Sequence, residues 1–147
     1  MPNCESWARE CFDLSFRHFS CSNECATADL VPNGCRQIYG VLYQISDNRV
    51  YRSCSVGLMT LDKIEHEGRA YSRTRIHVVM AAPPHKSYEP ITYLVKTPSS
   101  GIKTSAKYVG HIIKGLREHN APDDYVEYVK KRAIENNSSL ASELLEM

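Results

Sequence analysis

The chain contains 147 residues, of which 42% are apolar and 24% are charged, and its formal net charge is +1. This composition is typical of a soluble globular protein. The nearly balanced charge gives no overall attraction to nucleic acid or to an acidic membrane surface, and no apolar run is long enough to span a bilayer. Residues 1–5 lack the basic and apolar regions of a signal peptide. We therefore expect a cytoplasmic protein with no nucleic-acid or membrane partner.

The cysteines allow more than one interpretation. There are six: Cys4, Cys11, Cys21, Cys25, Cys35 and Cys54. Because the chain carries no export signal, free thiols in a reducing compartment are the expected state. The alternative is a zinc site formed by Cys21, Cys25 and Cys35, with Cys11 or His18 as the fourth ligand. Their spacing lacks the paired short knuckles of structural zinc sites, so we expect no metal.

Three strands are predicted in the first third of the chain. Residues 12–19 alternate between apolar and polar positions, which indicates a half-buried strand. Residues 25–31 form a weaker strand that ends at a Pro-Asn-Gly turn. Residues 38–45 are rich in β-branched and aromatic side chains and give the strongest strand of the three. Within that strand, Gly40 predicts a bulge or a close approach of another group to the backbone.

A charged segment separates these strands from two more. Apolar residues at helical spacing predict a short helix over residues 58–65, which leads into the segment 61–68 with its two glutamates, Glu65 and Glu67. A long strand follows at residues 70–80. After a proline-rich break, residues 91–95 form another strand, which we expect to be its hairpin partner.

The last third of the chain has helical periodicity. The first helix starts near Thr104, and we expect its buried side to carry Tyr108, Ile112, Gly115, Leu116 and His119. A second helix starts at Pro122, with two aspartates in its first turn. After a break at residues 136–139, a short terminal helix is expected to dock weakly.

This order of elements predicts an α+β fold, namely a small mixed, mostly antiparallel β-barrel or curved sheet flanked by C-terminal helices. We expect a loose N-terminus at residues 1–10, a single domain at residues 11–135 and a helical tail at residues 136–147. Taken one at a time, the motifs are better explained by packing or by solvated charges than by chemistry.

Taken together and in order, the motifs resemble the γ-glutamylcyclotransferase family over roughly residues 12–128. The segments that carry the resemblance are Gly40-Val41-Leu42-Tyr43-Gln44-Ile45, Leu61-Asp62-x-x-Glu65, Tyr71, Thr92-Tyr93-Leu94 and the tail Tyr108-x6-Gly115-x2-Glu118-His119-x2-Pro122-x2-Tyr125. The tail is the most specific of these. The resemblance implies a small mixed β-barrel with flanking helices.

The resemblance also implies a site. In that family the glutamate of an LDxxEG-like segment is the catalytic acid and base. Counted from Leu61, this residue is Glu65; counted back from Gly68, it is Glu67, which we keep in reserve. Tyr93 matches a tyrosine on a strand that faces the pocket, although core packing explains it equally well. Gly40 is the second residue expected to contact substrate.

The implied reaction is the cyclisation of a small-molecule γ-glutamyl amide to 5-oxoproline, with release of an amine or amino acid. The substrate's own α-amine is the nucleophile, so the intramolecular arrangement itself supplies the proximity. One glutamate can take up and return the proton if partial burial raises its pKa towards neutrality. No metal or cofactor is needed, and we expect a monomer or weak homodimer.

One departure from the family favours an alternative. The family begins with a strand that ends in a YGSN-type loop, whose backbone amides hold the glutamyl group and the oxyanion, and this sequence contains no such motif. A truncated chain, a splice form or a divergent relative would each explain its absence. The alternative function is therefore a non-catalytic member of the fold that acts as a binding or interaction module.

Overall fold

The computed structural model describes residues 12–33, 36–42 and 71–147. The chain divides into two compact units, one made of Met1–Val41 with Pro98–Met147 and the other of Leu42–Thr97. Each unit has its own internal contacts.

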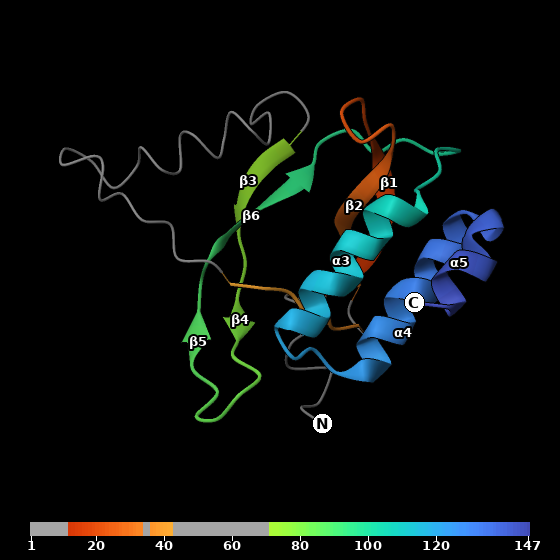
Figure 1. Ribbon diagram of the computed structural model, residues 1–147. Helices are drawn as coiled ribbons and strands as arrows, with labels where there is room; N and C mark the ends of the chain where they lie inside the picture. Colours follow the sequence, from red (N-terminus) through yellow and green to blue (C-terminus); the bar gives the residue numbers. More distant parts are fainter. Residues whose placement is uncertain (1–11, 34–35, 43–70) are drawn as a thin grey trace, which may run out of the picture. The chain divides into compact units, whose positions relative to one another are not determined.

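The first unit begins with a β-hairpin. Strand β1 (Phe12–Ser20) pairs with strand β2 (Cys25–Pro32) in antiparallel fashion, and residues 21–24 form the turn (Figure 1). The ladder shifts register between Phe16 and His18. Leu14 and Phe16 are buried, as their alternating positions in the sequence predict. Both strands are therefore confirmed.

Helices cover the core of this unit. They are α3 (Ala106–Glu118), α4 (Asp123–Asn136), the 3₁₀ turn η1 (Ser138–Leu140) and α5 (Ala141–Leu145). The hydroxyl group of Ser105 caps α3 by accepting the backbone N–H of Tyr108. Asp123 and Asp124 lie in the first turn of α4, where the helix dipole favours negative charge. The chain thus carries its own start signals for both long helices.

The buried face of α3 lies one position away from the predicted one. The structure buries four of its side chains, namely Ala106, Val109, Ile113 and Leu116. Tyr108 and Ile112 are half-buried at the margin, and His119 is exposed. The reason is that Tyr108 uses its hydroxyl oxygen to accept the backbone N–H of Ala28 in β2 at 2.8 Å, which holds its ring at the edge of the core.

The C-terminal helix completes the core instead of docking weakly. Leu144 is 0% exposed and Leu140 is 6% exposed, whereas Leu145 is 70% exposed. The buried residues of the unit form one cluster, which consists of Leu14, Phe16, Ala26, Ala106, Val109, Ile113, Leu116, Tyr125, Val126, Val129, Ala133, Leu140 and Leu144. Burial of large leucine side chains stabilises the folded state, so α5 belongs to the core.

The second unit contains short antiparallel ladders. Strand β3 (Tyr71–Arg75) pairs with β6 (Ile91–Val95), as predicted for a hairpin. Strand β4 (Val78–Val79) pairs with β5 (Ser87–Tyr88), and β5 was not predicted. The predicted strand 70–80 is interrupted after Arg75. The N–H of Ile76 still donates to the carbonyl oxygen of Pro90 at 3.0 Å, but proline has no N–H to return, so the regular ladder stops there.

The predicted strand 38–45 is wrong over its described part. Residues 36–42 form no regular secondary structure, and residues 43–45 lie outside the described residues. Ile38 packs against the core of the first unit, and Tyr39 contacts α4. Side chains that favour strands are therefore used here for packing against a helix, because strand propensity mostly reflects a fit to a half-buried surface.

The α+β class is confirmed by these small antiparallel sheets and the helices that follow them. The described strands form three two-stranded sheets, and no closed barrel is seen among them, so the barrel stays a prediction. Within the same residues, no helix has the length and apolar character needed to cross a membrane.

Candidate functional site

The glutamates of the predicted site lie in the segment 43–70, outside the described residues. This applies to Glu65 and to its reserve, Glu67. The other two predicted site residues are described. Gly40 belongs to the first unit and Tyr93 to the second.

Gly40 is exposed, and the space beside its Cα is open. A Cβ atom built on Gly40 would have nothing within 4 Å. The described glycine with a positive φ is Gly101, so backbone conformation does not require a glycine at position 40. An open Cα that needs neither a turn nor close packing leaves room for another group to approach the backbone.

Tyr93 lies at the middle of β6, opposite Arg73 of β3. All five residues of β6 are half-buried, so its two faces do not divide into a buried and an exposed one. A half-buried tyrosine has an apolar ring for packing and a hydroxyl group that needs a polar partner. This environment fits both the packing role and the substrate-contacting role of Tyr93.

A contact between Tyr39 and Tyr125 restrains the backbone just before Gly40. The two ring centroids are 5.2 Å apart and the ring planes are tilted by 51°. Tyr125 is 8% exposed and belongs to the core. Helix α4 therefore contacts residue 39 through this pair of rings.

Burial raises the pKa of Tyr125 from 10.0 to about 12. The nearby backbone amide of Tyr39 opposes this change, because it favours the phenolate. The charge of Asp13 and the neighbouring Tyr128 raise the pKa further. Tyr125 is thus a neutral hydrogen-bonding group at physiological pH.

Tyr128, one turn further along α4, forms a second group of contacts. Its hydroxyl donates to Oδ1 of Asp13 at 2.6 Å, and its ring centroid lies 4.8 Å from the guanidinium carbon of Arg36. Burial, with the hydrogen bond to Asp13 and the charge of that carboxylate, raises the pKa of Tyr128, while Arg36 and Arg132 lower it. Arg36 therefore contacts Tyr128, and Tyr39 contacts Tyr125.

A model of the AIG2-like family matches residues 37–129. The chain belongs to the AIG2-like family. This family has the γ-glutamylcyclotransferase-like fold, so the resemblance found in the sequence is confirmed. The match includes Gly40, Glu65, Glu67, Tyr93 and Tyr125. No curated protein and no solved structure gives a match.

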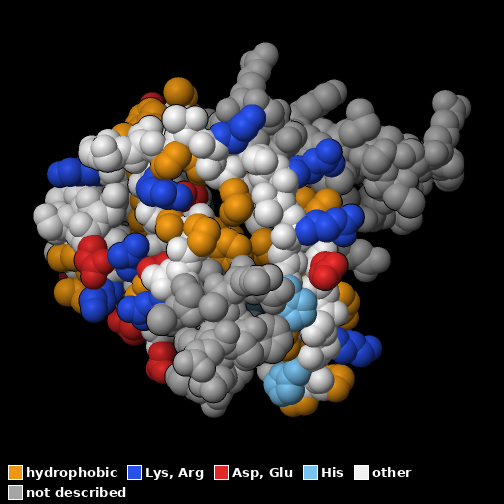
Figure 2. Space-filling model, turned by 180° about the vertical axis from the view of Figure 1, so that it is seen from behind, with side chains coloured by type: hydrophobic (Ala, Val, Ile, Leu, Met, Phe, Trp, Pro, Cys, Tyr) orange, Lys and Arg blue, Asp and Glu red, His pale blue; other side chains and the backbone are white. Residues whose placement is uncertain are grey.

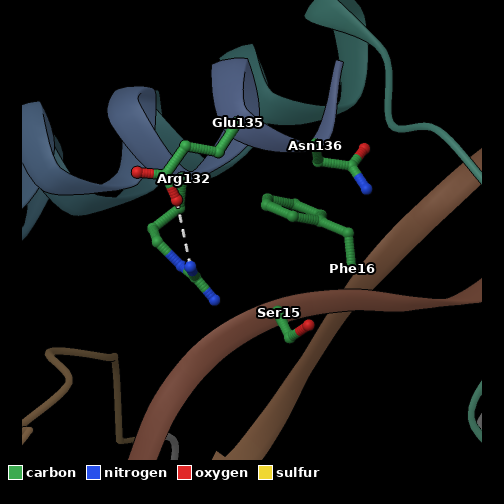
Figure 3. Close-up of a pocket in the computed structure, with 5 residues that line it drawn as sticks. All are labelled: Ser15, Phe16, Arg132, Glu135 and Asn136. Atoms are coloured by element: carbon green, nitrogen blue, oxygen red, sulfur yellow. Dashed lines mark hydrogen bonds and ion pairs between the residues drawn. The ribbon is translucent and has the colours of Figure 1, made fainter. Parts of the chain in front are cut away.

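A hollow with a volume of about 210 Å³ lies between β1 and the end of α4 in this AIG2-like protein (Figure 3). Its lining residues are Ser15, Phe16, Arg132, Glu135 and Asn136. Arg132 donates to the carbonyl oxygen of Leu14 from Nε at 3.1 Å and from Nη2 at 2.9 Å, and to Glu135 from Nη1 at 3.0 Å. Because these groups hold the helix against the strand, the hollow is a structural junction.

Asn136 has a similar structural role. Its side-chain oxygen accepts the N–H of Thr104 at 2.7 Å, and its Nδ2 donates to the carbonyl oxygen of Ile102 at 3.1 Å. The end of α4 is thereby joined to the chain that enters α3. Sequence reasoning predicts a break at this asparagine but not these bonds, since they link residues that are distant in the chain.

The described cysteines of the AIG2-like chain lie in different environments. Cys21 is exposed in the β1–β2 turn, and Cys25 is buried at the start of β2; both are free thiols. Cys11 and Cys35, the other thiols of the possible zinc set, lie outside the described residues. Among the residues that the structure describes, no group of three or more His, Cys, Asp or Glu side chains is placed to hold a metal ion.

The charged side chains do not form a field of one sign on the face seen in Figure 2. Lys and Arg side chains of the described residues are mixed there with acidic and apolar ones. Independently of that view, α4 contains ion pairs that join Lys130 to Glu127 at 3.0 Å and Arg132 to Glu135 at 3.0 Å. Such pairs neutralise one another locally.

Proposed function

We propose that this protein cyclises a γ-glutamyl amide to 5-oxoproline and releases an amine or an amino acid. The observation that carries the proposal is the AIG2-like match over residues 37–129, which includes all of the predicted site residues. The AIG2-like family acts on small-molecule substrates, which supports a γ-glutamyl amide as the substrate. The proposed site consists of Glu65, with Glu67 in reserve, and of Gly40 and Tyr93.

The proposed reaction exchanges one C–N bond for another. The α-amine nitrogen of the γ-glutamyl group attacks the γ-carbonyl carbon, and the bond from that carbon to the departing nitrogen breaks. Glu65 takes a proton from the attacking amine and gives it to the departing amine, so neither water nor a cofactor is consumed. Because nucleophile and carbonyl belong to one molecule, the protein mainly has to hold them in a reactive geometry.

In this proposal Gly40 and Tyr93 contact the substrate. The open space beside the Cα of Gly40 would admit the glutamyl group close to the backbone, where amide and carbonyl groups are accessible. Tyr93 would contribute a hydroxyl group from a half-buried position on β6. The described surroundings of both residues are compatible with these roles.

The test is formation of 5-oxoproline from γ-glutamyl-alanine by the purified full-length chain. Loss of a general acid and base lowers the rate by about 10²- to 10⁴-fold, so Glu65→Gln should reduce turnover by at least about a hundredfold. Glu67→Gln is the matched control and should retain activity. If Glu67→Gln abolishes turnover and Glu65→Gln does not, the acid and base is Glu67. If the unaltered protein forms no 5-oxoproline, the proposal is wrong.

The second candidate is a binding module without catalysis. It is favoured by one observation, the absence of a YGSN-type segment from the 147 residues. Removing an oxyanion donor typically lowers turnover by about 10²- to 10³-fold without removing all substrate contacts. Calorimetric titration with γ-glutamyl-alanine separates the two functions, because binding with no 5-oxoproline formed supports the module and turnover supports the enzyme.

A further inference from the structure

The β3–β6 ladder places an arginine directly opposite Tyr93. In the antiparallel register of this pair of strands (Figure 1), Arg73 of β3 lies opposite Tyr93 of β6. Side chains of directly opposed residues project from the same face of a sheet, with their Cβ atoms about 4.5–5.5 Å apart. The guanidinium group of Arg73 is therefore within reach of a ligand that contacts Tyr93.

Arg75 belongs to the same face of the ladder. It follows Arg73 by two residues, and side chains two positions apart on a strand share a face. Its partner in the register is Ile91, two residues before Tyr93, so Arg75 is the diagonal neighbour of Tyr93 at a distance of roughly 7–8 Å. Two arginines therefore flank one tyrosine on a single face.

This face is open to solvent and carries an excess of positive charge. Arg73 and Arg75 are both exposed, whereas Tyr93 is half-buried between them. Residues 71–97 contain four Lys and Arg side chains but a single acidic one, Glu89. In the described part of the chain, Arg75 takes part in none of the ion pairs. An anion that approaches Tyr93 is therefore attracted by local charge.

The chemistry of arginine indicates which part of a γ-glutamyl amide this face would bind. A guanidinium group presents paired N–H donors that match the two oxygens of a carboxylate. Every γ-glutamyl amide has an α-carboxylate on its glutamyl part, and a γ-glutamyl amino acid has a second carboxylate on the departing part. Neither carboxylate changes in the cyclisation, so a cation that holds one contributes binding and orientation.

We propose that Arg73, with Arg75 as a second cation, binds a carboxylate of the substrate beside Tyr93. This inference rests on the proposed γ-glutamyl function and adds two residues that the motifs of the family resemblance do not contain. The two arginines do not take part in proton transfer. They determine which γ-glutamyl amides bind.

Two substrates that differ by one carboxylate test the inference and identify the anion. γ-Glutamyl-alanine has a carboxylate on its departing part, and γ-glutamyl-ethylamine lacks it. KM and kcat for 5-oxoproline formation are measured with both, for the unaltered chain, Arg73→Gln, Arg73→Lys and Arg75→Gln. Lys86→Gln is the matched control, because it removes one positive charge at an exposed position just before β5. Melting temperatures of all variants show whether each one folds.

Loss of a hydrogen bond between charged groups weakens binding by about tenfold or more. Arg73→Gln should therefore raise KM about tenfold with kcat nearly unchanged, which is the result of removing a contact made equally in the ground state and transition state. Arg73→Lys should recover part of the loss, since it keeps the charge without the paired donors. Arg75→Gln should have a smaller effect, and Lys86→Gln should have none.

The two substrates separate the two possible anions. A rise in KM for γ-glutamyl-alanine alone assigns the carboxylate of the departing amino acid to Arg73. An equal rise for γ-glutamyl-ethylamine assigns the glutamyl α-carboxylate instead, and either result supports the inference.

Other results overturn it. Unchanged KM for both substrates in folded Arg73→Gln and Arg75→Gln contradicts the inference and leaves the proposed function intact. A rise of the same size in Lys86→Gln also contradicts it, because the effect then comes from net charge and not from this face. An unaltered chain that forms no 5-oxoproline from either substrate overturns the proposed function, and this inference with it.

Discussion

The hydroxyl group of Tyr128 donates a 2.6 Å hydrogen bond to Oδ1 of Asp13, although the two residues are 115 positions apart. The bond joins α4 to the start of β1. Arg132, one turn further along the helix, adds two hydrogen bonds to the carbonyl oxygen of Leu14. The N-terminal hairpin and the C-terminal helix of the first unit are therefore held together by polar contacts as well as by the core.

Tyr128→Phe should lower the free energy of unfolding by about 1–2 kcal/mol, because it removes a hydrogen bond to a carboxylate that is only partly exposed. Urea denaturation measures the change. In a double-mutant cycle with Asp13→Asn, the two substitutions together should cost less than the sum of the single ones. Strict additivity would show that the two side chains do not interact in solution.

Arg17 and Asp29 form the most buried ion pair among the described residues. Nε and Nη2 of Arg17 both donate to Oδ2 of Asp29, at 2.9 and 2.7 Å, and the side chain of Asp29 is 0% exposed. Oδ1 of Asp29 has no hydrogen-bond partner in the described part of the chain. Arg17 is therefore the main group that compensates this buried charge.

Arg17→Met should destabilise the protein by roughly 3 kcal/mol, because it leaves a buried carboxylate without its cation. Chemical denaturation at neutral pH measures this effect. Adding Asp29→Asn to Arg17→Met should recover part of the loss, since it removes the uncompensated charge. Lys114→Ala breaks an exposed pair with Glu118 and should change stability by less than about 0.5 kcal/mol. A loss in Arg17→Met no larger than that control would contradict the prediction.

Leu144 and Leu145 are neighbours in α5 with opposite environments, being 0% and 70% exposed respectively. Leu144→Ala should cost about 2–4 kcal/mol, because it removes buried methyl groups and leaves a cavity. Leu145→Ala should stay within about 0.5 kcal/mol of the unaltered chain. Thermal or urea unfolding of the two variants gives the comparison. Similar effects of both substitutions would mean that α5 is not packed as described.

Local patterns in the sequence predict much of the first unit. The alternation at residues 12–19 and the aspartates after Pro122 act within a few positions, and both elements form where expected. The predicted strands are interrupted or absent where residues distant in the sequence determine the contacts. Ile76 faces Pro90, which ends a ladder, and Ile38 and Tyr39 pack against the core and α4 instead of pairing with a strand. Sequence periodicity contains no information about such partners.

The sequence predicts only those site residues that belong to the family motifs. The family resemblance gives Gly40, Glu65 and Tyr93 together, and the family itself is confirmed over residues 37–129. The resemblance also includes Tyr125, but only as part of the tail motif. Its contact with Tyr39 spans 86 residues of sequence and depends on the packing of α4, so neither spacing nor propensity could reveal it.

The raised pKa of Tyr125 predicts a loss of stability in alkaline solution. Its folded-state pKa of about 12 exceeds the ordinary value of 10.0, so the folded protein keeps this proton longer than the unfolded chain does. The resulting stabilisation is complete below pH 10 and is lost as the pH rises from 10 to about 12.

Urea midpoints measured at about pH 9 and about pH 11 should therefore fall more in the unaltered chain than in Tyr125→Phe, which lacks the ionisable group. Other tyrosines and lysines titrate in both proteins. Comparing the decrease in urea midpoint between the two proteins removes their contribution. Equal decreases in urea midpoint for the two proteins would mean that the Tyr125 hydroxyl is not desolvated in solution. Tyr88→Phe, which alters an exposed tyrosine on β5, is the control and should show the same decrease in urea midpoint as the unaltered chain.

Gly40→Ala and Gly115→Ala place the same methyl group at two open positions. Neither Cβ would meet another atom within 4 Å. Gly115 lies inside α3, so alanine there should stabilise the protein by about 0.5–1 kcal/mol and leave catalysis unchanged.

At Gly40 the added methyl would instead occupy the space proposed for substrate. Overpacking of this kind costs about 1–3 kcal/mol, so KM for γ-glutamyl-alanine should rise about tenfold or more without loss of melting temperature. An unchanged KM in Gly40→Ala would show that substrate does not approach this part of the backbone, while a rise in both variants would point to a general effect of the substitution.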